Sequence, residues 1–346
     1  MLVVENGELF DPAPRGRTTI VVAGGRIEKI GDIDASALAS PFAPEVVDAT
    51  GCIVTPGLID AHIHLIGGSG EQGFASASGP ISKDELLSAG TTTVVGLLGT
   101  DTTTRTLPSL MAKVKALREQ GLNALMWTGG YDARSLMGCV RDDIVLFEEI
   151  IGAGEIAIAD RRGTHSDART LARLASDCYI AGTLTGKAGV LHLHTGELRE
   201  RLSIVRELLD LGVPAASLHP THVNRNDELF AEAIELTRRG VAVDLDMVEE
   251  NLAHWLRQYD GDRSMLTIST DAPIGKVSNL FAQIGEVVRS EIWPLEDALA
   301  LATRNPARVL KLSDAGEIAE GKRADLLIIH RQTWAIRHVI AGGRLH

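Results

Sequence analysis

The chain has 346 residues, of which 45% are hydrophobic and 23% charged, and its formal net charge is -12. This length favours one large domain with a smaller one, and the composition excludes both intrinsic disorder and a mainly membrane-embedded protein. The acidic balance argues against a nucleic-acid partner, because phosphate binding needs a basic surface, and favours a small-molecule substrate.

The cysteines and the first residues indicate a cellular compartment. Cys52, Cys139 and Cys178 are widely spaced and form no CxxC pair, which is typical of reduced thiols. Met1–Phe10 carries no basic segment of a signal peptide, and no apolar run approaches the ~18 residues of a membrane span. We therefore expect a cytoplasmic protein without a membrane partner.

Short strands separated by turns are predicted at both ends of the chain. Near the start they cover Leu2–Val4, Thr18–Val22, Arg26–Ile30 and Glu45–Ala49, with a hairpin turn at Gly24-Gly25. Near the other end, the apolar runs are Ala324–Ile329 and Ala335–Ile340, followed by a turn at Gly342-Gly343. We expect residues 1–54 and 312–346 to build one small β-sandwich domain together.

Between these ends, apolar β runs alternate with longer amphipathic segments, which is typical of βαβ units. Helices are predicted, for example, at Leu107–Gln120, Asp167–Ala181, Leu198–Leu211 and Asp227–Arg239. Eight β runs are predicted at Ile53–His64, Thr92–Leu98, Ala124–Thr128, Glu155–Ala159, Gly189–His194, Ala216–His222, Val241–Leu245 and Leu266–Thr270. The pattern predicts an α/β protein with a (β/α)8 TIM barrel over residues 55–311, although a doubly wound open sheet would give similar alternation.

Several of the β runs end in side chains that bind metals. These are His62 and His64, His192 and His194, His219 and His222, and Asp271. A single histidine of this kind is more often structural than a ligand, but a barrel brings the ends of separate strands to one point. Imidazole and carboxylate ligands suit Zn²⁺ or a similar divalent ion, so the combined pattern predicts a metal site.

Motifs at both ends of the predicted barrel resemble a known group. The run Val54–His64, VTPGLIDAHIH, resembles the PG(L/F)IDxHxH signature of the amidohydrolase superfamily, and Gly316–Ile318 with Gly321–Leu326 resembles its return to the small sandwich. A narrower resemblance is to the isoaspartyl (β-aspartyl) dipeptidase family. It is carried by His64–Gly68 with Glu71, Val94–Asp101, Thr128–Tyr131 and Pro220–Asn226.

The dipeptidase resemblance implies two sets of site residues. The first would hold two divalent metal ions, with Zn²⁺ the first expectation: His62, His64, His194, His222 and Asp271. The second would contact the substrate: Glu71, Thr100, Tyr131, Arg162 and Arg225. Asp271 would also act as general acid and base, and Tyr131 would stabilise the oxyanion. His192 and His219 match positions that are not ligands and are interpreted as structural.

Two positions depart from the dipeptidase family. Where the family has a carbamylated lysine that bridges both metals, this chain has Glu155, in a register supported by Arg162 seven residues later. A carboxylate keeps the charge and both oxygens on a shorter side chain, and we predict that Glu155 bridges the metals; the alternative is a packing glutamate in a one-metal site. Gly275 stands at the family serine four residues after Asp271, which removes one polar contact to substrate.

The predicted reaction is hydrolysis of a β-aspartyl or related acidic dipeptide by a hydroxide shared between two metal ions. A cyclic-amide hydrolase of the dihydroorotase or hydantoinase kind would use the same metals but would need no partner for a free ammonium, such as Glu71. An amidohydrolase-type deaminase usually has one metal and would not need Glu155. The intact ligand set opposes a non-catalytic scaffold. We also expect a homo-oligomer.

Overall fold

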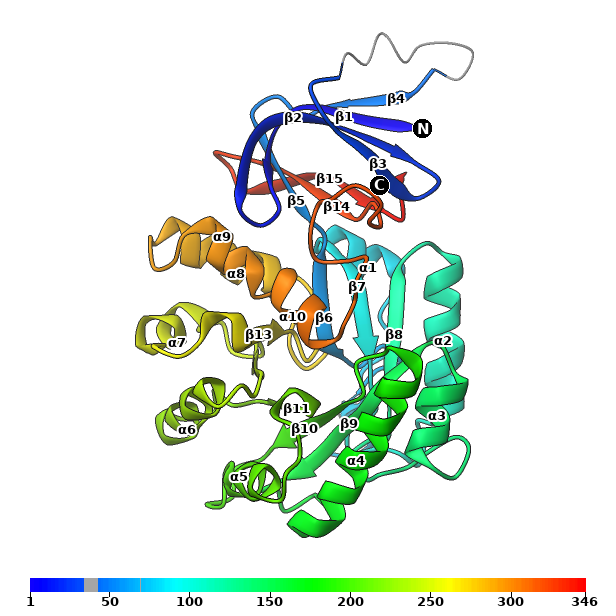
Figure 1. Ribbon diagram of the computed structural model, residues 1–346, viewed down its shortest axis with the longest axis vertical. Helices are drawn as coiled ribbons and strands as arrows, with labels where there is room; N and C mark the ends of the chain where they lie inside the picture. Colours follow the sequence, from blue (N-terminus) through cyan, green and yellow to red (C-terminus); the bar gives the residue numbers. More distant parts are fainter. Residues whose placement is uncertain (34–42, 69) are drawn as a thin grey trace.

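Both ends of the chain contribute to one eight-stranded sheet, which lies beside a curled parallel sheet (Figure 1). The computed structural model describes residues 1–33, 43–68 and 70–346. The strands of the first sheet are β1 (Leu2–Phe10), β2 (Pro14–Ala23), β3 (Arg26–Gly31), β4 (Glu45–Asp48), β5 (Cys52–Pro56), β14 (Leu326–His330), β15 (Ala335–Ala341) and β16 (Arg344–Leu345). Their order is β16-β15-β14-β5-β1-β2-β3, with β4 beside β1.

The strands predicted for this sheet are confirmed, and two of them are longer than expected. β1 continues past Glu5 and Asn6 because its pairing with β2 shifts register between Val4 and Gly7, where Asn6 has a φ of 64°. Such a bulge carries a strand past polar residues that interrupt the apolar pattern. Gly24-Gly25 turns the chain between β2 and β3, as predicted.

The second part of the fold is a set of parallel strands in chain order. Six of them, β6 (Leu58–Ile63), β7 (Thr91–Gly96), β8 (Asn123–Thr128), β9 (Ile150–Ile158), β10 (Val190–Thr195) and β11 (Leu218–Thr221), form one sheet, and β12 (Val243–Asp246) and β13 (Leu266–Ser269) form a parallel pair. The backbone N–H of Asp271 donates to the carbonyl of His62 at 3.1 Å, and Val223 N–H donates to Asp244 at 3.5 Å. These bonds bring the pair against both edges of the six-stranded sheet, consistent with the predicted barrel.

Helices follow the parallel strands and cover their outer side (Figure 1). They are α1 (Lys83–Ser88), α2 (Leu107–Glu119), α3 (Val140–Leu146), α4 (Ala168–Thr185), α5 (Ser203–Asp210), α6 (Asp227–Arg238), α7 (Leu252–Gln258), α8 (Asn279–Arg289), α9 (Leu295–Ala300) and α10 (Arg304–Val309), with short 3-10 turns at Phe74–Ser76, Ala215–Ser217 and Arg263–Met265. Side-chain caps fix several starts; Asp167, for example, accepts from Thr170 N–H. Among the described residues, no helix combines the length and apolar character that a membrane crossing requires.

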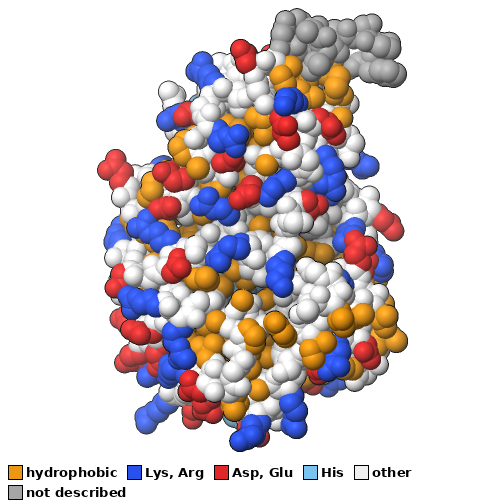
Figure 2. Space-filling model, viewed as in Figure 1, with side chains coloured by type: hydrophobic (Ala, Val, Ile, Leu, Met, Phe, Trp, Pro, Cys, Tyr) orange, Lys and Arg blue, Asp and Glu red, His pale blue; other side chains and the backbone are white. Residues whose placement is uncertain are grey.

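Charged side chains of both signs are interspersed over the face of the molecule seen in Figure 2, whereas apolar side chains gather near α3 and α4. Val145 and Leu146 on α3 are exposed, as are Tyr179, Ile180 and Leu184 on α4. The two helices pack against each other, and Arg141 of α3 pairs with Asp177 of α4. Exposed apolar side chains grouped on adjacent helices are typical of contact surfaces.

Two of the predicted β runs differ from the structure by more than two residues at one end. The run Ile53–His64 is two strands: β5 pairs with β14 in the first sheet, and β6 pairs with β7 in the second. The run predicted to begin at Glu155 is β9, which begins at Ile150. Gly152 and Gly154 conceal its β pattern, but both are required by close strand packing, because a Cβ atom at Gly154 would lie 2.7 Å from the Cβ of His192.

Gly57, at the passage from β5 to β6, allows a prediction about stability. A Cβ atom here would overlap the side chain of buried Thr92, and Gly57 N–H donates to Asp325 O at 2.9 Å, which restrains the backbone. Gly57→Ala is expected to lower the free energy of unfolding by ~1–3 kcal/mol through overpacking. Gly31→Ala is the control, because a Cβ atom there meets nothing within 4 Å. Equal urea midpoints for the two variants would contradict this prediction.

Candidate active site

The carboxyl ends of the parallel strands surround a pocket of about 430 Å³. Every site residue predicted from the sequence lines this pocket, with the exception of His62, which is fully buried against it: His64, Glu71, Thr100, Tyr131, Glu155, Arg162, His194, His222, Arg225 and Asp271. The sequence-predicted residues are therefore together in space, although they come from different strands and loops.

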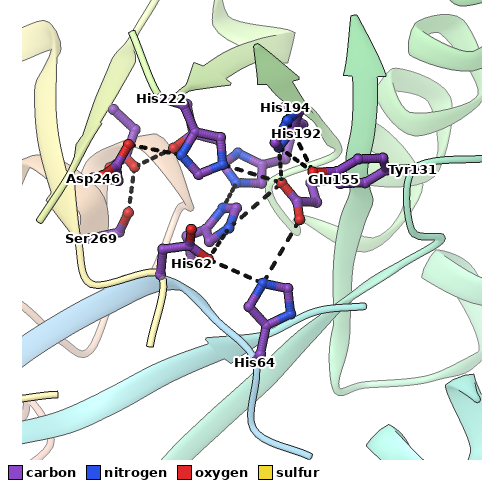
Figure 3. Close-up of polar contacts among 12 residues, drawn as sticks. His62, His64, Tyr131, Glu155, His192, His194, His222, Asp246 and Ser269 are labelled. Carbon is purple, nitrogen blue, oxygen red and sulfur yellow. Dashed lines mark hydrogen bonds and ion pairs between the residues drawn. The ribbon is translucent and has the colours of Figure 1, made fainter. Parts of the chain in front are cut away.

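Glu155 of β9 lies at the centre of the predicted metal ligands (Figure 3). Its Oε2 atom is 2.8 Å from His194 Nδ1, 3.4 Å from His222 Nε2 and 3.6 Å from His62 Nε2. Its Oε1 atom is 3.9 Å from His64 Nε2. The two oxygens of one buried carboxylate thus face different imidazoles, which is the arrangement that a bridging ligand requires.

Asp271, two residues after the end of β13, faces the same cluster. Its Oδ1 atom is 3.1 Å from His64 Nε2 and 3.3 Å from His62 Nε2. These short contacts do not have the geometry of hydrogen bonds. Asp271 Oδ1 and His62 Nε2 are therefore buried without a hydrogen-bond partner among the described residues. Unpartnered buried polar atoms are unfavourable unless another group binds them.

The donor set fits a divalent cation. Two groups of three, His62–His64–Asp271 and His62–Glu155–His222, each have their ligand atoms within 4.8 Å of one another. Nitrogen and carboxylate oxygen donors of this kind suit Zn²⁺ and related ions. The unpartnered atoms of His62 and Asp271 both belong to these groups, so a bound cation would satisfy them.

The second ring nitrogen of His62 is held by His192. His62 Nδ1 is 2.8 Å from His192 Nε2, and His192 Nδ1 is 2.9 Å from the carbonyl oxygen of His219. Because a carbonyl only accepts, His192 Nδ1 donates, and a neutral His192 then accepts from His62 Nδ1–H. This leaves the lone pair of His62 on Nε2, which faces the carboxylates of the cluster.

His222 and His194 are held in the same way by carboxylates. His222 Nδ1 is 2.9 Å from Asp246 Oδ2, and His194 Nε2 is 3.1 Å from Asp160 Oδ2. Burial opposes a charged His222, but its hydrogen bonds with Asp246 and Glu155 outweigh burial and raise its pKa to about 10. The carboxylates therefore favour positive charge at this point, which a metal cation would supply in place of a proton.

Asp160 and Asp246 were not predicted from the sequence. Each directly follows a predicted β run, Glu155–Ala159 and Val241–Leu245 respectively. The rule that strand ends carry functional groups, applied to aspartates as well as histidines, could have found both.

His192 and His219 lie deeper in the core. His192 stacks on Trp127 with ring centroids 4.9 Å apart, and His219 Nε2 is 3.0 Å from Thr267 Oγ1. Burial lowers the pKa of His192 well below its usual value and that of His219 to about 4, which keeps both imidazoles neutral. Neither histidine belongs to the two ligand groups found among the described residues.

Opposite charges face each other on the pocket wall beside the cluster. Arg162 Nη1 lies 2.7 and 2.6 Å from the two carboxylate oxygens of Glu71, and Thr100 Oγ1 lies 3.4 Å from Glu71 Oε1. Burial raises the pKa of Tyr131, so its hydroxyl stays protonated, 3.1 Å from His194 Nδ1. The pocket therefore contains a cation, an anion and a neutral hydroxyl donor close to the predicted ligands.

Arg225 and Gly275 complete the set of positions singled out in the sequence. Arg225 Nε donates to Thr195 O at 2.9 Å, which orients the guanidinium, and Nη1 is 3.9 Å from Glu197 Oε1. A Cβ atom at Gly275 would overlap the carbonyl oxygen of Thr270. A serine at this position therefore cannot be accommodated without a shift of the backbone.

Comparisons with known proteins show the family of this chain and structures of similar fold. Residues 53–345 match the amidohydrolase family. A crystal structure of a β-aspartyl dipeptidase from Fervidobacterium islandicum AW-1 is similar to this chain with a TM-score of 0.92 and 32% identity, covering 99% of this chain and 96% of that one. The same dipeptidase in complex with the dipeptide β-Asp-Leu gives a TM-score of 0.90 and 31% identity, with 99% and 95% covered.

The curated sequence relatives match this chain either at lower identity or over a smaller part of their own length. Adenine deaminase 1 of Carboxydothermus hydrogenoformans is 27% identical over 379 positions, which cover 99% of this chain and 57% of the deaminase. A dihydroorotase of Geotalea daltonii is 39% identical over 66 residues, which cover 18% of this chain and 15% of that enzyme. The matched part is thus little more than half of the deaminase and a small part of the dihydroorotase.

Proposed function

The chain belongs to the amidohydrolase family, and on this premise we propose that it hydrolyses β-aspartyl dipeptides or closely related acidic dipeptides. The observation that carries the proposal is the pairing of a buried carboxylate-imidazole cluster around Glu155 with the Glu71–Arg162 ion pair on the same pocket wall. A dipeptide of this kind has a free ammonium group and carboxylates near its scissile amide, and these charges complement the wall.

The proposal includes two divalent metal ions, with Zn²⁺ the first candidate. The residues that would hold them are His62, His64, Glu155, His194, His222 and Asp271. Such ions supply a nucleophilic water at neutral pH and polarise the scissile carbonyl. The partners of His62, His194 and His222 support this assignment, because each imidazole is held through one ring nitrogen by a residue outside the proposed ligand set and turns its other nitrogen towards the cluster.

Asp271 and Tyr131 are proposed to act on the reacting atoms. The Asp271 carboxylate lies at the cluster beside His62 and His64, where it could accept the proton of the attacking water and deliver it to the leaving amine. The Tyr131 hydroxyl is protonated and lies beside His194, where it can donate to the oxyanion of the tetrahedral intermediate.

The charged residues of the wall are proposed to orient the dipeptide. Arg162 and Arg225 offer forked donors to its carboxylates, whereas Glu71, with Thr100 beside it, faces the ammonium. Glu71 and Arg162 neutralise each other on the pocket wall, so a substrate that carries both charges can replace each partner with an equivalent one. A cyclic amide without a free ammonium would leave Glu71 without a partner.

We also propose a domain division for this architecture. Residues 55–311 would form the closed (β/α)8 barrel, and residues 1–54 and 312–346 the small β-sandwich. Support comes from the chain order of β6 to β13 and from the hydrogen bond that Asp271 N–H donates to His62, which joins the last strand region to the first.

The proposed function can be tested on purified protein loaded separately with Zn²⁺, Mn²⁺ or Co²⁺. β-Asp-Leu, α-Asp-Leu, dihydroorotate, a hydantoin and adenine would be compared by kcat/KM. We expect β-Asp-Leu to be the best substrate of this set and a chelator to abolish its hydrolysis. Preference for adenine or for a cyclic amide, with no turnover of β-Asp-Leu, would overturn the assignment.

Arg225→Lys is expected to lower kcat/KM for β-Asp-Leu by ~10–100-fold, the range for loss of a hydrogen bond to a charged group. Lysine keeps the positive charge but loses the planar fork and the Nε–H that Arg225 donates to Thr195. The control is Arg173→Lys on the exposed side of α4, outside the pocket. If both variants keep the kcat/KM of the wild type, Arg225 is not a substrate anchor.

A further inference from the structure

Asp160 contacts both the predicted metal cluster and the predicted substrate anchor. It lies two residues after the end of β9 and is only 6% exposed. Its Oδ2 atom lies 3.1 Å from His194 Nε2 and 2.6 Å from Arg162 Nη2. Its Oδ1 atom lies 2.9 Å from Arg162 Nε and 2.8 Å from the backbone nitrogen of Arg162. Both oxygens of one carboxylate are thus occupied by a metal-facing imidazole and a pocket guanidinium.

We infer that Asp160 is a positioning residue that couples His194 to Arg162, so that metal affinity and recognition of the substrate carboxylate depend on the same side chain. The inference rests on the proposed function, because it takes His194 as a metal ligand and Arg162 as a substrate anchor. Asp160 itself lies behind both groups and does not line the pocket.

Toward His194, Asp160 offers a carboxylate that favours the proton on Nε2 once a metal binds Nδ1. With the proton on Nε2, where the Asp160 carboxylate can accept it at 3.1 Å, the lone pair lies on Nδ1, the atom that faces Glu155 Oε2 at 2.8 Å. A carboxylate behind a ligand imidazole fixes its tautomer and ring orientation and increases its basicity. Loss of this contact would allow the proton to move to Nδ1, the atom that a metal needs free.

Toward Arg162, Asp160 holds one edge of the guanidinium and leaves the other for the pocket. Nε and Nη2 form a two-pronged pair with the carboxylate, while Nη1 points to Glu71. The anchor is therefore rigid before substrate arrives, which reduces the entropy lost on binding. The backbone around Asp160 is packed as well, because a Cβ atom at Gly196 would overlap the Cβ of Asp160.

Asp160→Asn is the sharpest test, because asparagine has nearly the same shape but only one acceptor oxygen. Each carboxylate oxygen of Asp160 accepts two of its four contacts. In either orientation of the asparagine side chain, the NH₂ group would replace one of these oxygens and would face hydrogen-bond donors. Asp325→Asn is a matched control. Asp325 is 7% exposed and accepts from Arg323 Nε at 2.8 Å, again an arginine two positions away, but it lies outside the pocket.

Two readouts are measured on the full-length protein. The first is affinity for Zn²⁺ alone, by competition with a chromophoric chelator, which is expected to fall by ~10–100-fold for one of two ions in Asp160→Asn. The second is kcat and KM for β-Asp-Leu at saturating Zn²⁺, where KM is expected to rise by about tenfold with a smaller change in kcat. Asp325→Asn is expected to change neither.

A double-mutant cycle tests the coupling itself. Arg162→Lys alone is expected to raise KM and to leave Zn²⁺ affinity unchanged. In the Asp160→Asn, Arg162→Lys double variant, the rise in KM is expected to be no larger than that of the stronger single variant, because both substitutions remove the same anchor. Additive effects on KM would show that Asp160 does not act through Arg162.

The possible results separate the inference from the proposed function. If the wild type binds Zn²⁺ and cleaves β-Asp-Leu, but Asp160→Asn behaves like Asp325→Asn in both readouts, the inference fails and the function stands. If the wild type neither binds Zn²⁺ nor cleaves the dipeptide, both fail. Should Asp160→Asn not fold, Asp160→Glu, which keeps the charge but lengthens the side chain, is judged by the same two readouts.

Discussion

Asp271→Asn is expected to lower kcat for β-Asp-Leu by at least ~100-fold, the lower range for a positioned acid-base group, while the fold and most of the bound metal are retained. The amide keeps an oxygen near His62 and His64 but cannot accept a proton from the attacking water. The backbone at this position has a φ of 50°, in the left-handed region that asparagine tolerates as well as aspartate does. The substitution therefore removes the acid-base function with little strain.

Three measurements check this expectation: kcat at saturating Zn²⁺, metal content, and the thermal midpoint of unfolding. Asp297→Asn, which removes a surface carboxylate paired with Arg263, is the control and is expected to keep full activity. Turnover by Asp271→Asn within about threefold of the wild type, with metal retained, would show that another group carries the proton.

Glu155→Gln is expected to reduce the metal content from about two ions per chain towards one, with activity falling alongside it. Two close divalent cations repel strongly, and the Glu155 carboxylate is the anion that faces His62, His194 and His222 at once. Glutamine keeps the size of the side chain and removes its charge. For the same reason, the wild type is expected to reach full metal loading without added bicarbonate, because no lysine has to be carbamylated.

The matched control is Glu149→Gln. Glu149 is another buried glutamate, 7% exposed and paired with Lys115, directly before β9, at the end of the strand away from the pocket. Elemental analysis of dialysed protein is the measurement, and the control is expected to keep the metal content of the wild type. One ion per wild-type chain, or two ions in Glu155→Gln, would mean that Glu155 does not bridge.

Periodicity predicted the alternation of strands and helices because it depends on local apolar patterns. Helices α2, α4 and α6 begin within a residue of the predicted positions, since their first turns carry capping side chains such as Thr106 and Asn226. The helix predicted from Leu198 begins only at Ser203, where the chain leaves a turn with Arg201 at a φ of 44°. A turn of this kind depends on long-range packing, which a local pattern does not contain.

The positions of candidate site residues at strand ends could be predicted from the sequence. The contacts between side chains of neighbouring strands could not be predicted, because they depend on strand register. The pairing of β9 with β10 shifts register between Leu191 and Leu193, and beyond the shift His194 pairs with Ala157. One residue of slip would turn His194 to the other face of the sheet. The contacts of His194 with Glu155 and Asp160 therefore depend on this register shift between β9 and β10, which no sequence pattern indicates.

The bond between Asp271 N–H and the carbonyl of His62 has a consequence for the synthesis of the protein. Nearby, Thr270 Oγ1 donates to Asp60, a partner 210 positions earlier in the chain. A nascent chain in which β13 has not yet been synthesised lacks Asp271 and would not contain the complete set of proposed ligands. Ion capture at the proposed centre would therefore come last, after a slow long-range closure. Once bound, the ion would shift the folding equilibrium towards the native state, so the folded fraction of newly made molecules would depend on the metal supply.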